Sequence, residues 1–329
     1  MSESKYTFNM VISSLIFIFV IGMALFTCQA YGDKALNDAL QINGLTLNST
    51  DVSSGQTASI IAAASLQTMP PGSEMQILTS AIIGLIIGVI LVFVLVKFLG
   101  KFVVKCLFLL SLGTLLLMFF TSFGYTIFGA PIFTPSYILT LIGIDIIILL
   151  TWLSYPEWWV ISGMSILLAI AGASFFGASL PPSTIIGMFI ILSIYDYIAV
   201  LRSNVMMKFA KGVMDIHLPA AITLPYNKKS SMITGGINFS EEVKERSDKG
   251  FMVLGTGDLL FPTILAVSTS LYISTIGGII VGICIMMSYI VLMYTLYYSE
   301  FGKKVQGLPG LPFLCSGAII GYIITILII

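Results

Sequence analysis

The chain alternates between long apolar runs and polar segments. A helix needs about 20 apolar residues to cross the hydrocarbon core of a bilayer, and nine runs meet this length. They are 8–30, 77–98, 102–122, 135–153, 158–176, 182–201, 251–271, 275–297 and 310–329. The eighth run follows the seventh almost directly, around Ser274 to Gly278, so we expect these two spans to form a tight hairpin. The pattern predicts an all-α membrane protein with nine transmembrane helices.

The composition agrees with a chain that lies mostly in a membrane. Hydrophobic residues make up 57% of the sequence and charged residues 9%, with a mean hydropathy of +1.05, whereas soluble domains carry about 25% charged residues. The lipid bilayer is therefore the expected surrounding, and a net charge of +0 gives no indication of nucleic-acid binding. The first run exceeds the about 7–15 apolar residues of a signal peptide and precedes no A-x-A site, so we expect it to be retained.

The basic residues fall almost entirely on one side of the predicted spans. Of the fifteen Lys and Arg residues, only Lys34 lies on the opposite side. The other fourteen are Lys5, Lys97, Lys101, Lys105, Arg202, Lys208, Lys211, Lys228, Lys229, Lys244, Arg246, Lys249, Lys303 and Lys304. Because cytoplasmic loops are enriched in Lys and Arg, this predicts a multi-pass protein of the cell membrane with a cytoplasmic N-terminus and an extracellular C-terminus.

Two long polar segments divide the chain. Residues 31–76 form the predicted external loop, in which Asn48 begins a glycosylation sequon. Residues 202–250 form the predicted cytoplasmic loop and carry eight of the fifteen basic residues. We therefore expect an N-terminal bundle of five spans over 1–176 and a C-terminal part with spans six to nine over 177–329.

The sequence predicts neither a metal centre nor a cofactor. Zinc sites are built from clusters of His and Cys, but His217 is the only histidine. The cysteines occur singly in apolar runs without CxxC spacing, and they are Cys28, Cys106, Cys284 and Cys315. We expect them to be buried, inert thiols.

Three acidic residues, Asp145, Asp196 and Asp258, lie in apolar runs, where a carboxylate is costly and points to function. Asp196 is near the end of the sixth run, six residues before Arg202, which is roughly 9 Å along a helix. Asp258 is near the start of the seventh run, nine residues after Lys249, which is roughly 13 Å on the same scale. Because these spans run in opposite directions, both carboxyls are predicted at one depth, in the cytoplasmic third of the bilayer.

A pair of carboxyls can activate water. Two carboxyls a few ångströms apart cannot both ionise, so one stays protonated while the other acts as a base. The pair alone fits peptide hydrolysis, a proton- or cation-coupled transporter or leak channel, and a structural role about equally. Asp145 lies mid-span with no acid at its depth, so we expect it to be a hydrogen-bonded residue of the bundle.

Small and aromatic residues flank the two carboxyls. Gly255 and Gly257 precede Asp258, and their missing Cβ atoms would let a substrate strand or a helix approach that carboxyl. Small residues also ease ordinary helix packing, which is the alternative. Tyr195, beside Asp196, can supply a hydroxyl or line a polar cavity.

The ninth run opens with two prolines three residues apart, Pro309 and Pro312. Prolines disfavour regular helix and leave backbone groups unpaired, which membranes tolerate only inside protein or beside a wet cavity. Pro309, Gly310 and Leu311 would then adjoin the two carboxyls. The alternative is a plain helix start, where Pro is common.

Together these elements resemble the presenilin and signal-peptide-peptidase family of intramembrane aspartyl proteases. That family carries YD in the sixth of nine spans, GxGD in the seventh and PAL at the start of the ninth. The matching segments are Tyr195-Asp196, Gly255-Thr256-Gly257-Asp258 and Pro309-Gly310-Leu311, with Gly310 in place of the family's Ala. Tyr155-Pro156-Glu157-Trp158 also looks like the PEW segment of presenilins. Prepilin-type peptidases share GxGD but have fewer spans and lack the prolines of the ninth.

The resemblance implies a protease that cuts transmembrane helices of other proteins, with Asp196 and Asp258 as the catalytic dyad. Its substrate-binding residues would be Tyr195, Gly255, Gly257, Pro309, Gly310 and Leu311. The predicted orientation matches presenilins and is opposite to signal peptide peptidases, which implies substrates whose N-terminus lies outside. The short 202–250 loop is similar to that of compact archaeal homologues. The sequence implies no obligatory partner subunit and leaves a homo-oligomer open.

Overall fold

The computed structural model describes residues 3–42, 109–124, 135–155, 157–202, 221–225, 251–298 and 310–329, with single residues at 79, 83, 84, 87 and 127. Several predictions fall on residues outside these ranges. They concern the sequon at Asn48, Cys106, Pro156, His217, Pro309, most of the run 77–98 and most of the loop 202–250.

Helices occupy eight of the nine predicted spans in the described part of the chain. They are α1 (Glu3–Ile42), Leu109–Gly124, α4 (Pro135–Ser154), α5 (Trp158–Ser179), α6 (Pro182–Arg202), α10 (Thr256–Tyr272), α11 (Thr275–Tyr298) and α13 (Gly310–Ile328). Five of them are long and apolar enough to cross a membrane. The chain is a multi-pass membrane protein, and the nine-span count stays a prediction because the run 77–98 is largely outside the described residues.

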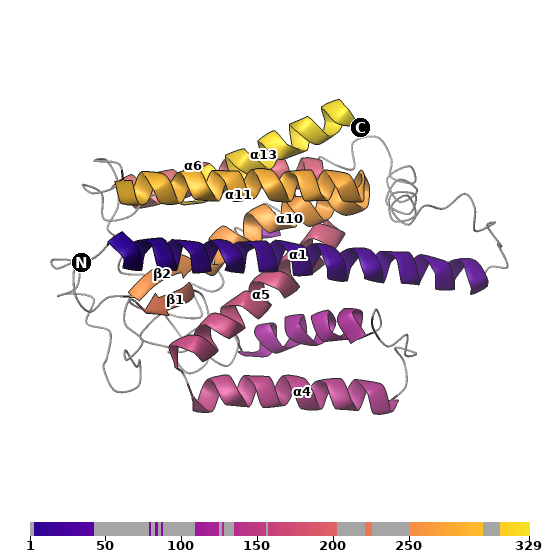
Figure 1. Cartoon of the computed structure of the whole chain (residues 1–329). Helices are drawn as coiled ribbons and strands as arrows, with labels where there is room; N and C mark the ends of the chain where they lie inside the picture. The colour runs from indigo at the N-terminus through magenta and orange to yellow at the C-terminus, as the bar shows by residue number, and fades with distance from the viewer. Residues whose placement is uncertain are drawn as a thin grey trace.

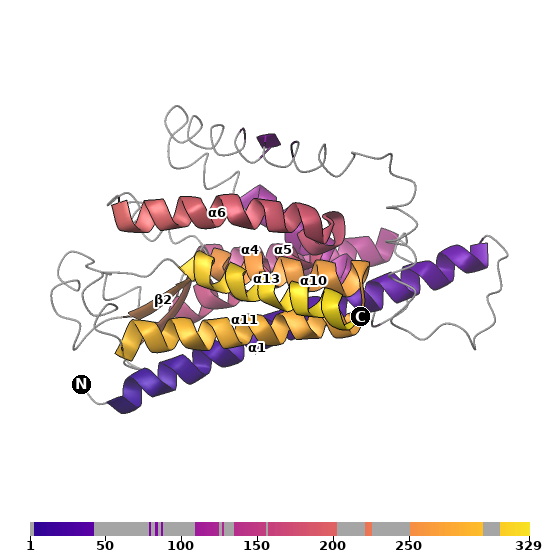
Figure 2. The same ribbon diagram turned by 90° about the horizontal axis from the view of Figure 1, so that it is seen from above.

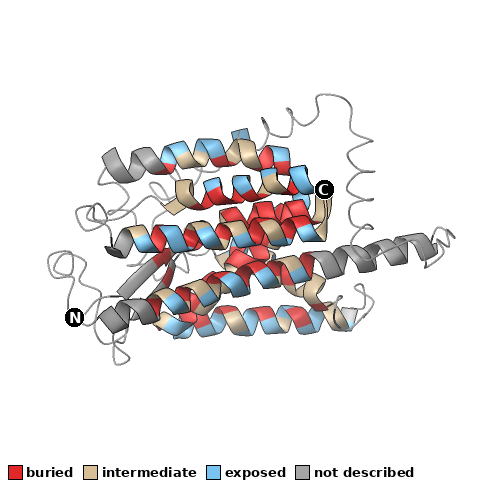
Figure 3. Cartoon of the chain, turned by 45° about the horizontal axis from the view of Figure 1, so that its top comes forward, coloured by how far each residue is buried: buried red, intermediate tan, exposed pale blue. Residues whose placement is uncertain are grey.

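Helix α10 lies at the centre of the bundle. It packs against α1, α5, α6, α11 and α13, and Figures 1 and 2 show these helices around it. Its side chains are buried on several faces, as a helix in the core must be, whereas α4 and α11 expose apolar residues on their outer faces (Figure 3). Those outer faces suit contact with lipid.

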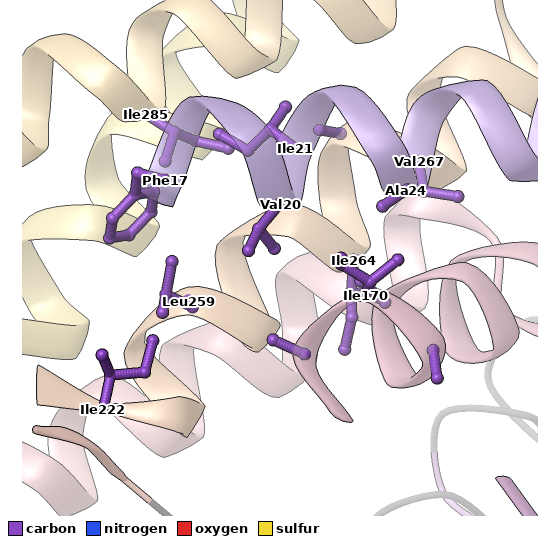
Figure 4. Packing of buried hydrophobic residues seen from close by; sticks show 14 of the residues in the cluster. Phe17, Val20, Ile21, Ala24, Ile170, Ile222, Leu259, Ile264, Val267 and Ile285 are labelled. Atoms are coloured by element: carbon purple, nitrogen blue, oxygen red, sulfur yellow. The ribbon is translucent and has the colours of Figure 1, made fainter. Parts of the chain in front are cut away.

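Helices α1, α5 and α10 pack together through buried apolar side chains and through a glycine, which has no side chain. Phe17 and Val20 of α1 meet Leu259 of α10 in one buried cluster (Figure 4). Small residues let transmembrane helices approach closely, and a Cβ on Gly177 of α5 would lie only 2.7 Å from Cβ of Val267. The backbone of α5 therefore lies directly against α10.

The seventh predicted span does not begin as a helix. Its first five residues form strand β2 (Phe251–Gly255), which pairs antiparallel with β1 (Ala221–Pro225), Ala221 facing Gly255. The bundle is helical as predicted, and this sheet is a local departure that corrects the helix predicted to begin at residue 251 and the loop predicted at 221–225. Ile222 and Leu254 oppose each other and are both buried, so a strand pair buries apolar side chains here as well as a helix would, and both strands include β-branched residues.

The external loop predicted from residue 31 begins as a helix instead. Helix α1 continues to Ile42 and runs past the other helices in Figures 1 and 2. Its apolar segment ends at Cys28, so residues 29–42 extend it by roughly 21 Å at 1.5 Å per residue. Ala, Leu, Gln and Lys in this stretch favour helix, and Gly32 alone does not end it.

The predicted hairpin between the seventh and eighth spans is confirmed. Helix α10 ends at Tyr272 and α11 begins at Thr275. The Ser274 hydroxyl accepts a hydrogen bond from the Gly277 backbone N–H at 3.0 Å, which is the role of an N-cap residue.

Candidate active site

Asp196 of α6 is buried, with 8% of its surface exposed. The backbone N–H of Leu311, in the first turn of α13, donates a hydrogen bond to its carboxyl. The first N–H groups of a helix lack partners within the helix, so Asp196 caps α13 and ties that helix to α6. Among the described residues, its Oδ2 atom has no hydrogen-bond partner, so this oxygen remains free to bind another group.

Asp258 lies in the first turn of α10, directly after the strand β2. Gly255 forms the N-cap with extended backbone angles (φ −61°, ψ 134°). A Cβ on Gly255 would lie 3.2 Å from Oδ2 of Asp258, and a Cβ on Gly310 of α13 would lie 3.0 Å from the same atom. Two backbone segments thus close around the Asp258 carboxyl at positions where a side chain would crowd it.

The fold brings the two carboxyls together. Helices α6, α10 and α13 pack against one another, as Figure 2 shows from above, and Asp258 interacts electrostatically with Asp196. Pro262 lies inside α10 and has no N–H to donate to the Asp258 carbonyl four residues earlier. The turn that carries Asp258 is therefore held by fewer hydrogen bonds than an ordinary helical turn.

The structure gathers most of the predicted site residues. Asp258, Gly255 and Gly310 lie in contact distance, and Leu311 reaches Asp196 through its backbone. A Cβ on Gly257 would meet the Phe261 ring at 3.5 Å, an ordinary contact, so packing within the described residues does not require a glycine there. Its predicted contact with a substrate stays a prediction. Tyr195 is 69% exposed and is not packed into the bundle. Its contact with a substrate stays a prediction.

The start of the ninth span is helical from Gly310 onward. Helix α13 includes Gly310, Leu311 and Pro312 in its first turn, where Pro is well tolerated. Of the two alternatives that the sequence left open for these residues, the plain helix start is therefore correct and the irregular backbone is not. The segment adjoins the two carboxyls as predicted, but through a helix N-terminus.

The sequence analysis missed that Cys315 belongs to this site. The predicted burial of Cys315 is confirmed, but the thiol also shares a hydrogen bond with Ser193 and interacts electrostatically with both Asp196 and Asp258. Helical spacing could have indicated this, because Cys315 is one turn beyond Leu311 and Ser193 is one turn before Asp196. Of the other thiols, Cys28 is buried and Cys284 is partly exposed.

Asp145 of α4 lies apart from these carboxyls. It is buried against the helix Leu109–Gly124, where a Cβ on Gly113 would lie 3.3 Å from its Oδ2 atom. Within the described ranges, its Oδ1 atom has no hydrogen-bond partner. The predicted hydrogen bond is therefore absent for that oxygen.

The described side chains include no group of three or more His, Cys, Asp and Glu residues that could hold a metal ion. The chemistry available at this site is that of two carboxyls, a thiol and the N–H groups of two helix N-termini.

Comparisons with known proteins bear on this arrangement. Residues 56–329 match the model of the family described as signal-peptide peptidase, presenilin aspartyl protease. Two solved structures of a presenilin family intramembrane aspartate protease, in space groups C222 and P2, are similar in fold. The first is 19% identical with a TM-score of 0.58, covering 95% of this chain and 97% of the other. The second is 20% identical with a TM-score of 0.58, covering 96% of each chain. A comparison with curated protein sequences found no match.

Proposed function

Since the chain belongs to the signal-peptide-peptidase and presenilin family of aspartyl proteases, we propose that it hydrolyses peptide bonds within transmembrane segments, using Asp196 and Asp258 to activate water. The observation that carries this proposal is that adjacent residues of α13 lie against both carboxyls. The Leu311 N–H donates to Asp196, and a Cβ on Gly310 would lie 3.0 Å from Oδ2 of Asp258. Carboxyls that could ionise independently would be poor partners for acid–base catalysis, whereas an interacting pair shares a proton.

In the proposed mechanism the ionised member of the pair takes a proton from a water molecule that attacks the amide carbonyl. The protonated member donates to the developing oxyanion, and the pair later protonates the leaving amine. The two protons belong to the pair, so neither role is assigned to one residue. The Leu311 N–H fixes the Asp196 carboxyl, which keeps its second oxygen available to the water.

The proposed chemistry has a defined pH dependence. Cleavage requires one proton on the dyad, because a doubly protonated pair has no base and a doubly ionised pair has no acid. We therefore expect the rate to fall on both sides of an optimum. A rate of peptide cleavage that rises or falls in one direction only would contradict a shared proton.

The sheet offers a place for the substrate. A transmembrane helix must unwind before its amides can react, and an unwound segment can add to a sheet edge as a strand. Within the described residues the sheet has two strands, and β2 leads directly into the turn of Asp258. A substrate strand beside this sheet would bring its backbone toward the dyad, and the predicted orientation favours substrates with an external N-terminus.

The test uses purified protein in liposomes with a fluorescently labelled transmembrane peptide. We expect cleavage by the wild type, loss of cleavage in Asp196→Asn and Asp258→Asn, and melting temperatures close to wild type in both. Asp145→Asn is the matched control, because it removes a third intramembrane carboxyl apart from the pair, and it should keep cleavage within about twofold.

The same preparation separates the protease from the alternative. A transition-state isostere of aspartic proteases should block cleavage and bind wild-type protein. Full cleavage by either dyad variant would overturn the proposed mechanism. Proton or cation flux in the liposomes that depends on both carboxyls, without peptide cleavage, would support a transporter or leak channel instead.

A further inference from the structure

Helix α10 has a partly exposed surface near its start, next to Asp258. From Pro262 to Ser270 every residue of this helix is buried. In the turn before Pro262 the partly exposed residues are Gly257, Asp258, Leu260 and Phe261. A helix at the centre of a bundle is otherwise covered on all its faces, so this is the stretch of α10 that another molecule can reach.

The direction of the Phe261 side chain follows from its three predecessors, because successive helical residues point about 100° apart. Asp258 faces the start of α13, and Leu259 faces α1 (Figure 4). Leu260 faces α5, where a Cβ on Gly172 would lie 2.5 Å from its Cδ1 atom. The next step of 100° brings Phe261 to the side of α10 that lies between α5 and α13.

Gly257 leaves one edge of the Phe261 ring uncovered. A Cβ at position 257 would lie 3.5 Å from Cε2 and 3.7 Å from Cδ2 of Phe261. These are ordinary van der Waals distances, and Ala would be the better helix residue, so packing of the bundle gives no reason for a glycine. Any side chain at this position would, however, cover the edge of the ring. The gap therefore fits an apolar side chain of another molecule, three residues along the helix from Asp258.

We propose that the Phe261 ring and the gap over Gly257 form a specificity subsite, which binds an apolar side chain of the transmembrane substrate beside the bond that is cleaved. Residues three apart are neighbours on a helix surface, so a substrate backbone at the Asp258 carboxyl places an adjacent side chain within reach of the ring. Phe261 touches the substrate and takes no part in the proton transfers. The selection of the cleaved bond rests on the proposed function, whereas binding of a transmembrane segment at Phe261 does not.

The expected preference is modest, because a transmembrane substrate brings its side chains from lipid and not from water. Association within a bilayer has no hydrophobic driving force and depends on van der Waals packing. We therefore expect Leu in the subsite to be preferred over Ala about tenfold in kcat/KM, the low end of what a hydrophobic pocket provides.

The first experiment uses two pairs of transmembrane peptides, after the cleavage site has been mapped by mass spectrometry. One pair has Leu or Ala on one side of the cleaved bond, and the other pair differs in the same way on the opposite side. Wild type should prefer Leu about tenfold in one of the pairs. Phe261→Ala, which removes the ring, and Gly257→Ala, which covers it, should each reduce that preference to below about twofold.

The matched control is Phe19→Ala, because Phe19 of α1 is 53% exposed and its variant should keep the preference of wild type. A variant that only loosens the bundle lowers cleavage of both peptides and leaves their ratio unchanged. No preference in an active wild type, or an unchanged preference in Gly257→Ala and Phe261→Ala, would overturn the subsite. If Phe261→Ala does not fold, Gly257→Ala alone decides the question.

The second experiment needs no cleavage. The photoreactive residue p-benzoylphenylalanine in place of Phe261, in the Asp258→Asn background, should capture a labelled transmembrane peptide, and excess unlabelled peptide should compete. The same residue in place of Phe19 should capture at least about tenfold less. Equal capture at the two positions would overturn the subsite, even if wild type cleaves no peptide. Selective capture at position 261 together with an inactive wild type would keep the binding surface and overturn the proposed function instead.

Discussion

The clearest prediction concerns Gly310, which occupies the position of Ala in the PAL motif of the family. Restoring that Ala would be expected from the motif alone to raise activity. The geometry around Asp258 indicates the opposite. A Cβ on Gly310 would lie 3.0 Å from Oδ2, 3.2 Å from Cγ and 3.4 Å from Oδ1 of Asp258, so it would touch the whole carboxyl.

Two effects of Gly310→Ala compete. Ala is a better helix residue than Gly by up to about 1 kcal/mol, which favours the first turn of α13. Against this, the contacts to Asp258 are shorter than the ordinary 3.5–4.0 Å between carbon atoms, so the carboxyl must move by a few tenths of an ångström. Overpacking of this kind costs about 1–3 kcal/mol, and here it falls on a proposed catalytic group. We therefore expect kcat to fall about tenfold while the melting temperature changes little.

The assay is peptide cleavage at saturating substrate, with Gly163→Ala of α5 as the control. A Cβ on Gly163 would meet nothing within 4 Å, so this variant gains helix propensity without a new contact and should cleave like wild type. If Gly310→Ala cleaves as fast as wild type or faster, the Asp258 carboxyl does not need the space that Gly310 leaves, and the description of this contact is wrong.

Four further variants test the packing of the bundle and the surroundings of the dyad. Ile222→Ala, at the buried position of β1, should destabilise the protein by about 2–5 kcal/mol, and an unchanged melting temperature would show that β1 is not packed on the bundle. Cys315→Ser should keep cleavage within about threefold, because a hydroxyl can replace the thiol in the hydrogen bond with Ser193. Cys315→Leu should lower cleavage at least about tenfold, because a larger side chain at a position that is 1% exposed must displace its neighbours in the site. Equal cleavage by the two Cys315 variants would refute this. Gly177→Leu should separate α5 from α10, because even a Cβ would lie 2.7 Å from Val267; a folded, monodisperse protein in size-exclusion chromatography would contradict that packing.

The helices could be predicted because the bilayer sets their length. The sheet could not be predicted, because the apolar segment Phe251 to Leu254 fits the start of a span and a buried strand equally well. Its partner, Ala221–Pro225, is separated from it by 25 residues that carry no pairing signal, from 226 to 250. The register with β1 is decided by burial of Ile222 and Leu254, which a single sequence does not specify.

The two carboxyls could be proposed as site residues from the sequence, because placing a carboxylate in an apolar run costs free energy. The residues that surround them could not be predicted in this way. Tyr195 is next to Asp196 in sequence, yet adjacent helical residues point about 100° apart, and Tyr195 is exposed while Asp196 is buried. Phe17 and Leu259, the residue after Asp258, meet only because α1 and α10 pack together. Their roles depend on contacts between helices, and no motif in the sequence marks them.

The arrangement also explains how an apolar bundle can hold the charge that the proposed dyad carries. A pair that shares one proton has one negative charge, which is costly in hydrocarbon. Asp258 lies in the first turn of α10, and Asp196 accepts a hydrogen bond from the first turn of α13. Helix N-termini carry a partial positive charge of about half a unit, so two of them converge on this one charge. A strand before α10 and a helix that starts at Gly310 thus bring both N-termini to the carboxyls. The strand lies where the sequence predicted a helix, whereas the helix start at Gly310 is one of the two alternatives that the sequence left open.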